Sequence, residues 1–234
     1  MKKLMLLFAL AAQMLCAAAG LADAEGVIVQ SSCNIMPSGE YYLVYTFAQV
    51  HNNSSEIICL DQGSFELHNG EQILSSQRVT NMWPYFLNPG EDGYFFDIVS
   101  FEPGEDGAAV VPNVTAIDYN VTYMTVNEAF GSHDLSAVSE IVEDEKQGSL
   151  SVICQITNTT DMVAYDPVVS FGLYTDGGQM IYADGMPLTG VGIPAGATVL
   201  ARFTVEEAFV SQWKSFGAAP TQVHVNASFR VESD

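Results

Sequence analysis

The side chains that could support catalysis or metal binding are few and scattered. No pair of histidines has the spacing of zinc ligands; the four are His51, His68, His133 and His224. The chain has no Cys-x-x-Cys, His-Glu-x-x-His or Gly-x-Ser-x-Gly segment, which are common motifs of zinc sites and serine hydrolases. We therefore predict no catalytic residue, no metal and no cofactor. Acidic residues are abundant, so a hydrolase with carboxylates on its loops stays an alternative.

The cysteines after Cys16 suggest one disulfide and one thiol. Cys33 and Cys59 are close in sequence, and in an exported protein they are expected to pair. Their bond would close a loop of about 26 residues and contribute roughly 3 kcal/mol. Cys154 lies in an alternating apolar pattern with Leu150 and Val152, so we expect it in the core. Burial there would make it a poor nucleophile, even with help from His224.

The densest aromatic cluster is the segment 82–87, and it contains Trp83, Tyr85 and Phe86. The corresponding segment 187–192 has no aromatic residue, so a requirement shared by both halves of the chain does not explain the cluster. Two interpretations stay open. The rings cover a core or pack against the other half, or they stand partly exposed as an anchor for a peptide or sugar.

Two acidic segments have the sequence Gly-Glu-Asp-Gly, at 90–93 and 104–107. Both suit β-turns, and neither has the spacing of an EF-hand loop. We predict turns, with calcium binding as the alternative.

The elements that position these residues are short strands separated by Gly, Pro, Asn and Asp turns. Such a pattern is typical of β-sandwiches, and only residues 205–216 suggest a helix. A repeat supports two units: the segment at Gln49 recurs at Gln155, an offset of 155 less 49, or 106. The same offset relates Phe65 to Phe171 and Gly90 to Gly196. We predict an all-β fold of two tandem immunoglobulin-like β-sandwich domains, residues 25–130 and 131–234.

The second repeat resembles a known family. Residues 171–177 read Phe-Gly-Leu-Tyr-Thr-Asp-Gly, which is similar to the motif of the FxLYD domain family, small β-sandwich modules of prokaryotic exported proteins. The segments 155–160 and 193–196 are also similar to that family, and the resemblance covers most of residues 148–234. In the first repeat, His68 and Asn69-Gly70 replace the expected Tyr and Asp-Gly. The resemblance implies a fold and no functional residue.

The N-terminus has the layout of a secretory signal peptide. Lys2 and Lys3 precede an apolar run over residues 4–21, and the small residues of 22–24 follow. We predict bacterial-type export with cleavage after residue 24. A lipid anchor at Cys16 is the less favoured alternative, because the preceding Gln-Met-Leu departs from the usual lipoprotein signal.

The chain is strongly acidic, with a formal net charge of −21. Removing residues 1–24 takes away two lysines and one aspartate, which leaves five basic and 27 acidic side chains, or −22. This charge excludes nucleic acid as a partner, and no later segment suits membrane insertion. We expect a secreted binding or spacer module with a protein, peptide or glycan partner. A hydrolase and a purely structural envelope component are the alternatives.

Overall fold

The computed structural model describes residues 26–103, 110–144 and 146–231, and they form an all-β fold with one short α-helix. The predicted fold class is confirmed at this level. The helix, α1 (Glu207–Phe216), lies where the sequence suggested one. The predicted signal peptide, Cys16 and the acidic turn at 104–107 lie outside the described residues.

Two sheets form the N-terminal half, residues 26–126. Sheet A contains β1 (Gly26–Ser38), β2 (Tyr41–Asn52), β7 (Asp92–Phe101) and β5 (Met82–Trp83), in that order. In sheet B, β3 is the central strand, with β8 along one edge and both β4 and β6 along the other. These strands are β3 (Ile57–Asn69), β4 (Gln72–Arg78), β6 (Phe86–Leu87) and β8 (Ala116–Val126).

The C-terminal half, residues 133–231, pairs its strands in a similar order. Sheet D contains β10 (Ser136–Asp144), β11 (Ser149–Thr157) and β16 (Thr198–Val205). Sheet C contains β14 (Met180–Pro187), β13 (Val168–Tyr174), β17 (Gln222–Phe229) and β9 (His133–Asp134). A short ladder joins β12 (Ala164–Tyr165) to β15 (Gly192–Ile193). The turn η1 (Glu128–Phe130) connects the two halves.

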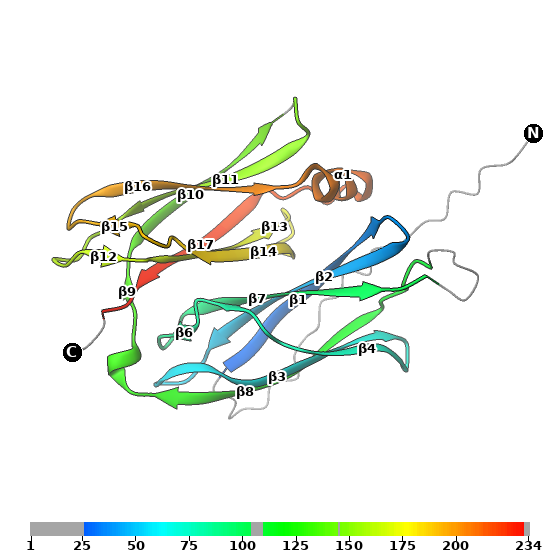
Figure 1. Ribbon diagram of the computed structural model, residues 1–234, viewed down its shortest axis with the longest axis horizontal. Helices are drawn as coiled ribbons and strands as arrows, with labels where there is room; N and C mark the ends of the chain where they lie inside the picture. Colours follow the sequence, from blue (N-terminus) through cyan, green and yellow to red (C-terminus); the bar gives the residue numbers. More distant parts are fainter. Residues whose placement is uncertain (1–25, 104–109, 145, 232–234) are drawn as a thin grey trace, which may run out of the picture.

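The four large sheets are stacked in the order B, A, C, D, from the bottom to the top of Figure 1. One apolar core lies between sheets B and A and includes Phe65, Phe95 and Val44. A second core continues from sheet A through sheet C to sheet D. Within it, Phe47 of sheet A contacts Tyr182 at 5.0 Å, and Phe171 contacts Phe203 of sheet D at 5.0 Å. Sheet A is therefore packed on both of its faces.

A buried asparagine closes the same loop in each half. Asn52 is fully buried, and its amide donates to the carbonyls of Glu56 at 2.8 Å and Leu87 at 2.9 Å. Its side-chain oxygen accepts bonds from the backbone and hydroxyl of Ser54. Asn158, which is 106 positions later (158 less 52), makes the equivalent bonds to Met162 and Ile193. The four side-chain hydrogen bonds satisfy the amide, so its burial carries little penalty.

Small residues of sheet C allow sheet A to approach closely. A Cβ added to Gly172 would lie 2.8 Å from the ring of Tyr94, and one added to Gly185 would lie 2.8 Å from Cβ of Trp83. Trp83 and Tyr94 therefore fill depressions that exist because these two positions have no side chain. This places Trp83 between the halves, as one of the two sequence interpretations expected for that residue.

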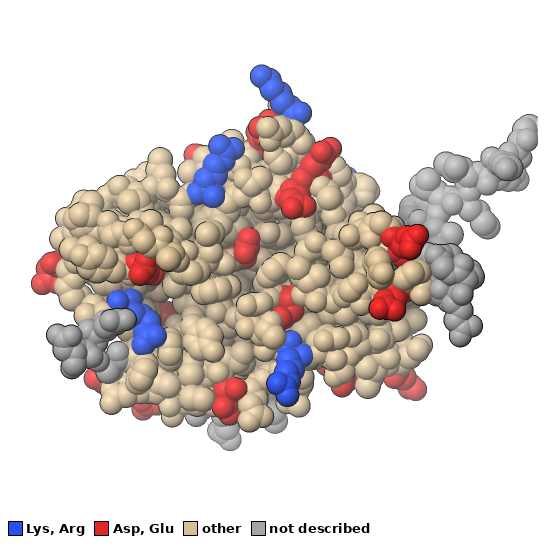
Figure 2. Space-filling view, viewed as in Figure 1, with Lys and Arg blue, Asp and Glu red and all other residues tan. Residues whose placement is uncertain are grey.

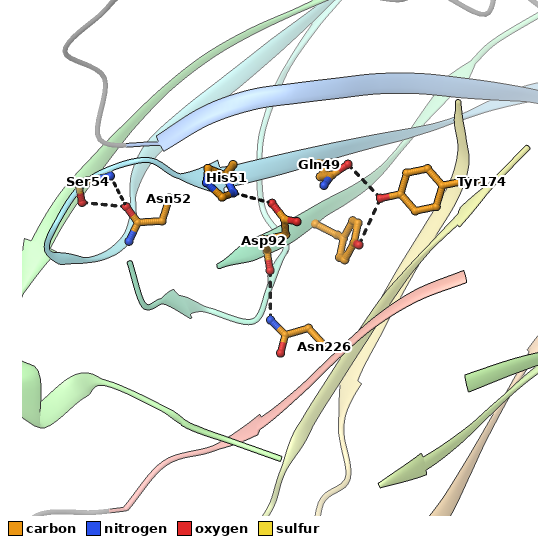
Figure 3. A network of polar contacts seen from close by, with 8 residues as sticks. Gln49, His51, Asn52, Ser54, Asp92, Tyr174 and Asn226 are labelled. Atoms are coloured by element: carbon orange, nitrogen blue, oxygen red, sulfur yellow. Dashed lines mark hydrogen bonds and ion pairs between the residues drawn. The ribbon is translucent and has the colours of Figure 1, made fainter. Parts of the chain in front are cut away.

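Polar side chains also join the two halves, as Figure 3 shows. The Tyr174 hydroxyl donates to Oε1 of Gln49 at 2.9 Å and lies 3.3 Å from the hydroxyl of Tyr94. Burial raises the pKa of Tyr174 to about 12, so this hydroxyl keeps its proton. At the other end of the network, Asn226 donates to the backbone carbonyl of Asp92 at 3.2 Å.

Helix α1 adds a further contact between the halves. It buries Phe209, Val210 and Trp213 and ends at Gly217, whose φ of 68° suits a glycine C-cap. The indole N–H of Trp213 donates to Oδ1 of Asn34 in β1 at 3.0 Å. A residue of the first strand thus satisfies the one polar atom of a buried tryptophan in the last helix.

We expect Asn52→Ala to lower the free energy of unfolding by about 2 to 4 kcal/mol, because it removes four side-chain hydrogen bonds and takes this donor away from the Leu87 carbonyl, where the bond is buried. The measurement is chemical denaturation. The neighbouring Asn53 is exposed, so Asn53→Ala is the matched control. Equal stability of the two variants would show that the buried amide contributes nothing.

We expect Gly185→Val to destabilise the protein by about 2 kcal/mol, because the new side chain overlaps Trp83. Gly177→Val serves as control, since the nearest atom to an added Cβ there is 3.7 Å away. Thermal unfolding followed by tryptophan fluorescence reports both changes. If the two variants melt together, the close approach at Gly185 does not hold the halves in contact.

Candidate binding face on sheet B

The outer face of sheet B is a continuous surface built by alternation along β8. The even-numbered residues from Asp118 to Met124 in β8 are exposed, while Tyr119, Val121 and Tyr123 pack against the core. Residues paired across an antiparallel ladder share a face, so the β3 partners of these residues also face outward. From one end to the other, the pairs are Cys59 with Met124, Gln62 with Thr122, Ser64 with Asn120, and Glu66 with Asp118.

One end of this face is apolar and partly exposed. Phe86 and Met124 flank Cys59 across the sheet. We call Tyr85, Phe86, Met124 and Phe130 the aromatic patch. Tyr85 is 54% exposed, Phe130 45% and Met124 44%. Such a group of large apolar side chains at the surface is typical of a contact site.

Ring contacts hold the aromatic patch together. The ring centroids of Phe86 lie 5.6 Å from Tyr85 and 5.7 Å from Phe130, and the second pair is stacked. The guanidinium of Arg230, which follows β17, lies 4.1 Å above the ring of Phe86 and 5.4 Å from that of Phe130. The patch therefore joins residues of β6, β8, η1 and the C-terminal half, and one of its ring faces already holds a cation.

The middle of the face is a polar hollow. Its volume is about 680 Å³, and its lining residues are Asp61, Gln62, Gly63, Ser64, Arg78, Val79, Asn120 and Thr122. A bulge in β3 between Leu60 and Gln62 shapes it. On the other edge of β3, β6 pairs with residues 58 and 59 and β4 begins its pairing at Ser64. The Val79 N–H also donates to the Gly63 carbonyl at 3.0 Å, so this edge of β3 pairs with neither strand over residues 60–62.

The far end of the face is charged. The Nε2 atom of His68 lies 3.2 Å from Asp118 and 3.5 Å from Glu66. This group limits the face on the side away from the aromatic patch.

The equivalent face of the C-terminal half is covered. Ser170 of β13 pairs with Gly185 and Asn226, as Ser64 of β3 pairs with Arg78 and Asn120. At that position of sheet C, Trp83 and Tyr94 fill the depressions beside Gly185 and Gly172. Sheet B has Arg78 and Glu66 instead. The two faces have equivalent strand pairing, but sheet A covers the face of sheet C, whereas the face of sheet B lies on the outside of the stack.

The structure separates the residues of the predicted aromatic anchor. Tyr85 and Phe86 belong to the aromatic patch, whereas Trp83 packs against sheet C. No motif in the sequence marks Phe130, Met124 or Arg230, nor the polar residues of the hollow. The alternation of β8 was the available signal, because its even positions read Asp, Asn, Thr, Met.

The predicted disulfide between Cys33 and Cys59 is absent: the cysteines of the described residues are free thiols. Cys33 belongs to sheet A and lies near Tyr119, whose pKa is raised by burial first and then by the neighbouring Asp97 and Cys33. Cys59 belongs to sheet B and pairs with Met124, five residues further along β8. Five residues of strand span roughly 16 Å, whereas a disulfide needs Cα atoms within about 7 Å. Cys33 and Cys59 therefore lie in different sheets and at different positions along the strand direction, too far apart for a disulfide.

The three thiols are also poorly suited to nucleophilic chemistry. Burial raises the pKa of Cys33 to about 12 and that of Cys154 to about 11. Burial and then the charge of Asp61 raise the pKa of Cys59. A raised pKa leaves little thiolate at neutral pH. Cys154 lies in the core as predicted.

Beside the aromatic patch, hydrogen bonds of Asn88 join the two halves. Asn88 donates from its side chain to the carbonyl of Ser132 at 3.0 Å, and its backbone N–H donates to Glu91 at 2.7 Å. The first Gly-Glu-Asp-Gly segment begins in this turn, where the Glu91 N–H donates to the Asn88 carbonyl at 3.1 Å. No group of His, Cys, Asp and Glu suited to a metal ion occurs among the described residues.

Glu91 shares a hydrogen bond with Asp134 of β9. Two carboxylates cannot form such a bond, so one of the two groups carries a proton when the bond is present. Burial, and next this hydrogen bond, raise the pKa of Glu91 to about 7, and the Asp134 charge adds to the effect. The folded protein therefore binds this proton more tightly than the unfolded chain. Its contribution to stability is full below about pH 4.5 and is lost as the pH rises through about 7.

We expect Glu91→Gln to remove this part of the pH dependence. Relative to the variant, the wild-type protein should be more stable at about pH 5 than at about pH 8, because only Glu91 ionises between them at this site. Urea denaturation at both values measures the difference, and the exposed Glu71 provides the control Glu71→Gln. Parallel profiles for the wild type and Glu91→Gln would contradict the assignment.

Comparison with known proteins identifies no family. No family model matches the chain, and no curated protein matches it. Among solved structures, it is similar to a crystal structure of red sea bream transglutaminase, with 9% identity and a TM-score of 0.23. That alignment covers 84% of this chain and 29% of the transglutaminase chain. A 7S globulin of Momordica charantia has 7% identity and a TM-score of 0.13, over 86% and 82% of the two chains. Neither score is high enough to carry an argument about fold or activity.

Proposed function

We propose that this chain is a secreted, non-catalytic binding protein of two tandem immunoglobulin-like β-sandwich domains that contacts a protein, peptide or glycan through the outer face of sheet B. The observation that carries the proposal is the open aromatic patch beside the polar hollow. A chain that served only as a spacer would have no need to expose Tyr85 and Phe130, which are 54% and 45% accessible.

The strand pairing supports the domain assignment. In the N-terminal half, β1-β2-β7 and β3-β8 correspond to strands A-B-E and C-F of an immunoglobulin-like sandwich. The C-terminal half pairs β10-β11-β16 and β13-β17 in the same way. The equivalent bonds of Asn52 and Asn158 support a repeat of one module, and the FxLYD family is the family we propose for it.

Several observations support a binding role over a hydrolase. Glu91 and Asp134 share a hydrogen bond, whereas the acids of a retaining glycosidase stand about 5 Å apart and those of an inverting one further. Burial raises the pKa of Cys154 to about 11, and its cross-strand neighbours are Ser139 and Ala201. The contact between the two carboxyls and the raised pKa of the Cys154 thiol favour a structural role for both sites.

Export remains part of the proposal, resting on the leader over residues 1–24. Among the described residues, no helix has the length and apolar character to cross a membrane. Figure 2 shows acidic side chains spread over the visible face singly or in small groups, with a few basic ones between them. This distribution suits a soluble surface better than a single acidic docking patch.

We expect the double variant Tyr85→Ala/Phe130→Ala to lose at least tenfold in affinity for the partner, because these exposed rings would be covered on binding. Its free energy of unfolding should change by less than about 1 kcal/mol. Tyr41 and Phe216 are similarly exposed, at 44% and 43%, so Tyr41→Ala/Phe216→Ala is the matched control. The measurement is binding of purified protein to the native envelope fraction, and to peptides and oligosaccharides released from it.

Unchanged binding by the Tyr85 and Phe130 variant would contradict the proposal. So would an equal loss in the Tyr41 and Phe216 variant. A large fall in stability would instead assign the rings to the core.

A further inference from the structure

Most polar side chains that line the polar hollow of sheet B are not used by the protein itself; Thr122 is an exception, because its hydroxyl donates to the Gln62 carbonyl at 3.4 Å. Among the described residues, no hydrogen bond or ion pair involves the side chains of Arg78, Ser64 or Asn120. The side chains of Gln62 and Asp61 are also unpaired within that part of the chain. The hollow thus presents amide, hydroxyl, guanidinium and carboxylate groups together, and all are available to a ligand.

The register places these groups in two neighbouring rows. Arg78, Ser64 and Asn120 form one row across β4, β3 and β8, and Gln62 and Thr122 form the next. Adjacent strands lie about 4.8 Å apart, which is close to the width of a sugar ring. Donors and acceptors at this spacing suit a ligand that has hydroxyl groups around a compact ring. The volume of about 680 Å³ is also within the range of small-molecule sites.

The charges of the hollow favour a neutral ligand. Arg78 and Asp61 bring one positive and one negative group to the same lining, so the local sum is zero. An anion would meet Asp61 and the field of a chain with a net charge of −21. A cation would meet Arg78. A neutral ligand with many hydroxyls can donate to the carboxylate and accept from the guanidinium.

The C-terminal half shows what an asparagine at this register can do. Asn226 occupies the position equivalent to Asn120. Its side-chain amide donates a hydrogen bond of 3.2 Å to the backbone carbonyl of Asp92 in sheet A, the sheet that covers sheet C. In Figure 3 the Asn226 side chain points away from its strand toward Asp92. Asn120 has no such cover, so its amide is placed to donate to an acceptor above sheet B.

The neighbouring aromatic patch adds a surface for a second contact. Phe86 lies in the row that follows the hollow on the same face. The faces of aromatic rings pack well against the C–H groups of sugars, and a chain of sugars could run from the hollow to the patch. A polar hollow beside partly exposed rings therefore suits a glycan better than a folded protein.

We propose that the polar hollow binds a neutral sugar of a glycan. Hydrogen bonds between its hydroxyl groups and Arg78, Asn120, Gln62 and Asp61 hold this sugar, and the aromatic patch contacts the adjoining sugars of the same glycan. This inference rests on the proposed binding function and names its ligand class. Bonds from Arg78 and Asn120 to hydroxyl oxygens, and from a hydroxyl to Asp61, would supply the specificity.

The test uses isothermal titration of the exported protein with short gluco-, manno-, galacto- and xylo-oligosaccharides, and with uronic acid oligosaccharides as the charged arm. We expect binding to at least one neutral series, and a loss of about tenfold or more in Asn120→Ala and in Arg78→Ala, about the cost of one good polar contact. Gln155 is an exposed amide on the outer face of sheet D, so Gln155→Ala is the matched control and should bind as the wild type does. Denaturation of each variant confirms that it is folded.

The outcomes separate this inference from the proposed function. Binding only to the uronic acid series, only to peptides, or to none of the oligosaccharides would overturn the sugar assignment. Unchanged affinity of the Asn120 and Arg78 variants would also overturn it. If the Tyr85 and Phe130 variant still lost its partner in that case, the binding face would stand and only the role of the hollow would fall.

Discussion

The packing of sheet A on both of its faces is the constraint on which the rest of this structure depends. Val44 and Val50 of β2 face sheet B, while Tyr45 and Phe47 face the C-terminal half. A strand that is apolar on both sides is stable only if two layers cover it. The C-terminal half supplies the second layer, so the halves are held together by a core rather than by a few surface contacts. Sheets B and D are consequently the outer layers.

The difference between the open face and the covered face comes from a few positions. Gly172 and Gly185 leave room for Tyr94 and Trp83, and the buried hydroxyl of Tyr174 bonds to Gln49 across the contact. At the matching places of sheet B, Glu66 and Arg78 carry long charged side chains. The same strand arrangement therefore packs against another sheet in sheet C and is exposed to solvent in sheet B.

The sequence predicted the all-β fold and the late helix, because alternation and turn residues are local signals. The double packing of sheet A also had a local signal: residues 41–50 are apolar at odd and even positions alike. The hollow could not be predicted in this way. It depends on the bulge at Asp61 and on the pairing of β3 with both β4 and β8, which brings Arg78 and Asn120 together from 42 positions apart (120 less 78). The disulfide expectation failed for the same reason, since spacing along the chain does not say which sheet a cysteine joins.

The order of the layers has a further consequence for assembly. The two halves meet head to tail (Figure 1): the outer face of sheet A in the first half lies on sheet C of the second, which is the counterpart of sheet B and not of sheet A. Repetition of a heterologous contact produces a ring when its rotation closes and an open fibre when it does not. The charged residues Glu66 and Arg78 on the first face act as a terminal cap, as polar ends do in repeat proteins. The first sheet therefore does not offer a further copy the recess at two glycines that joins its own halves.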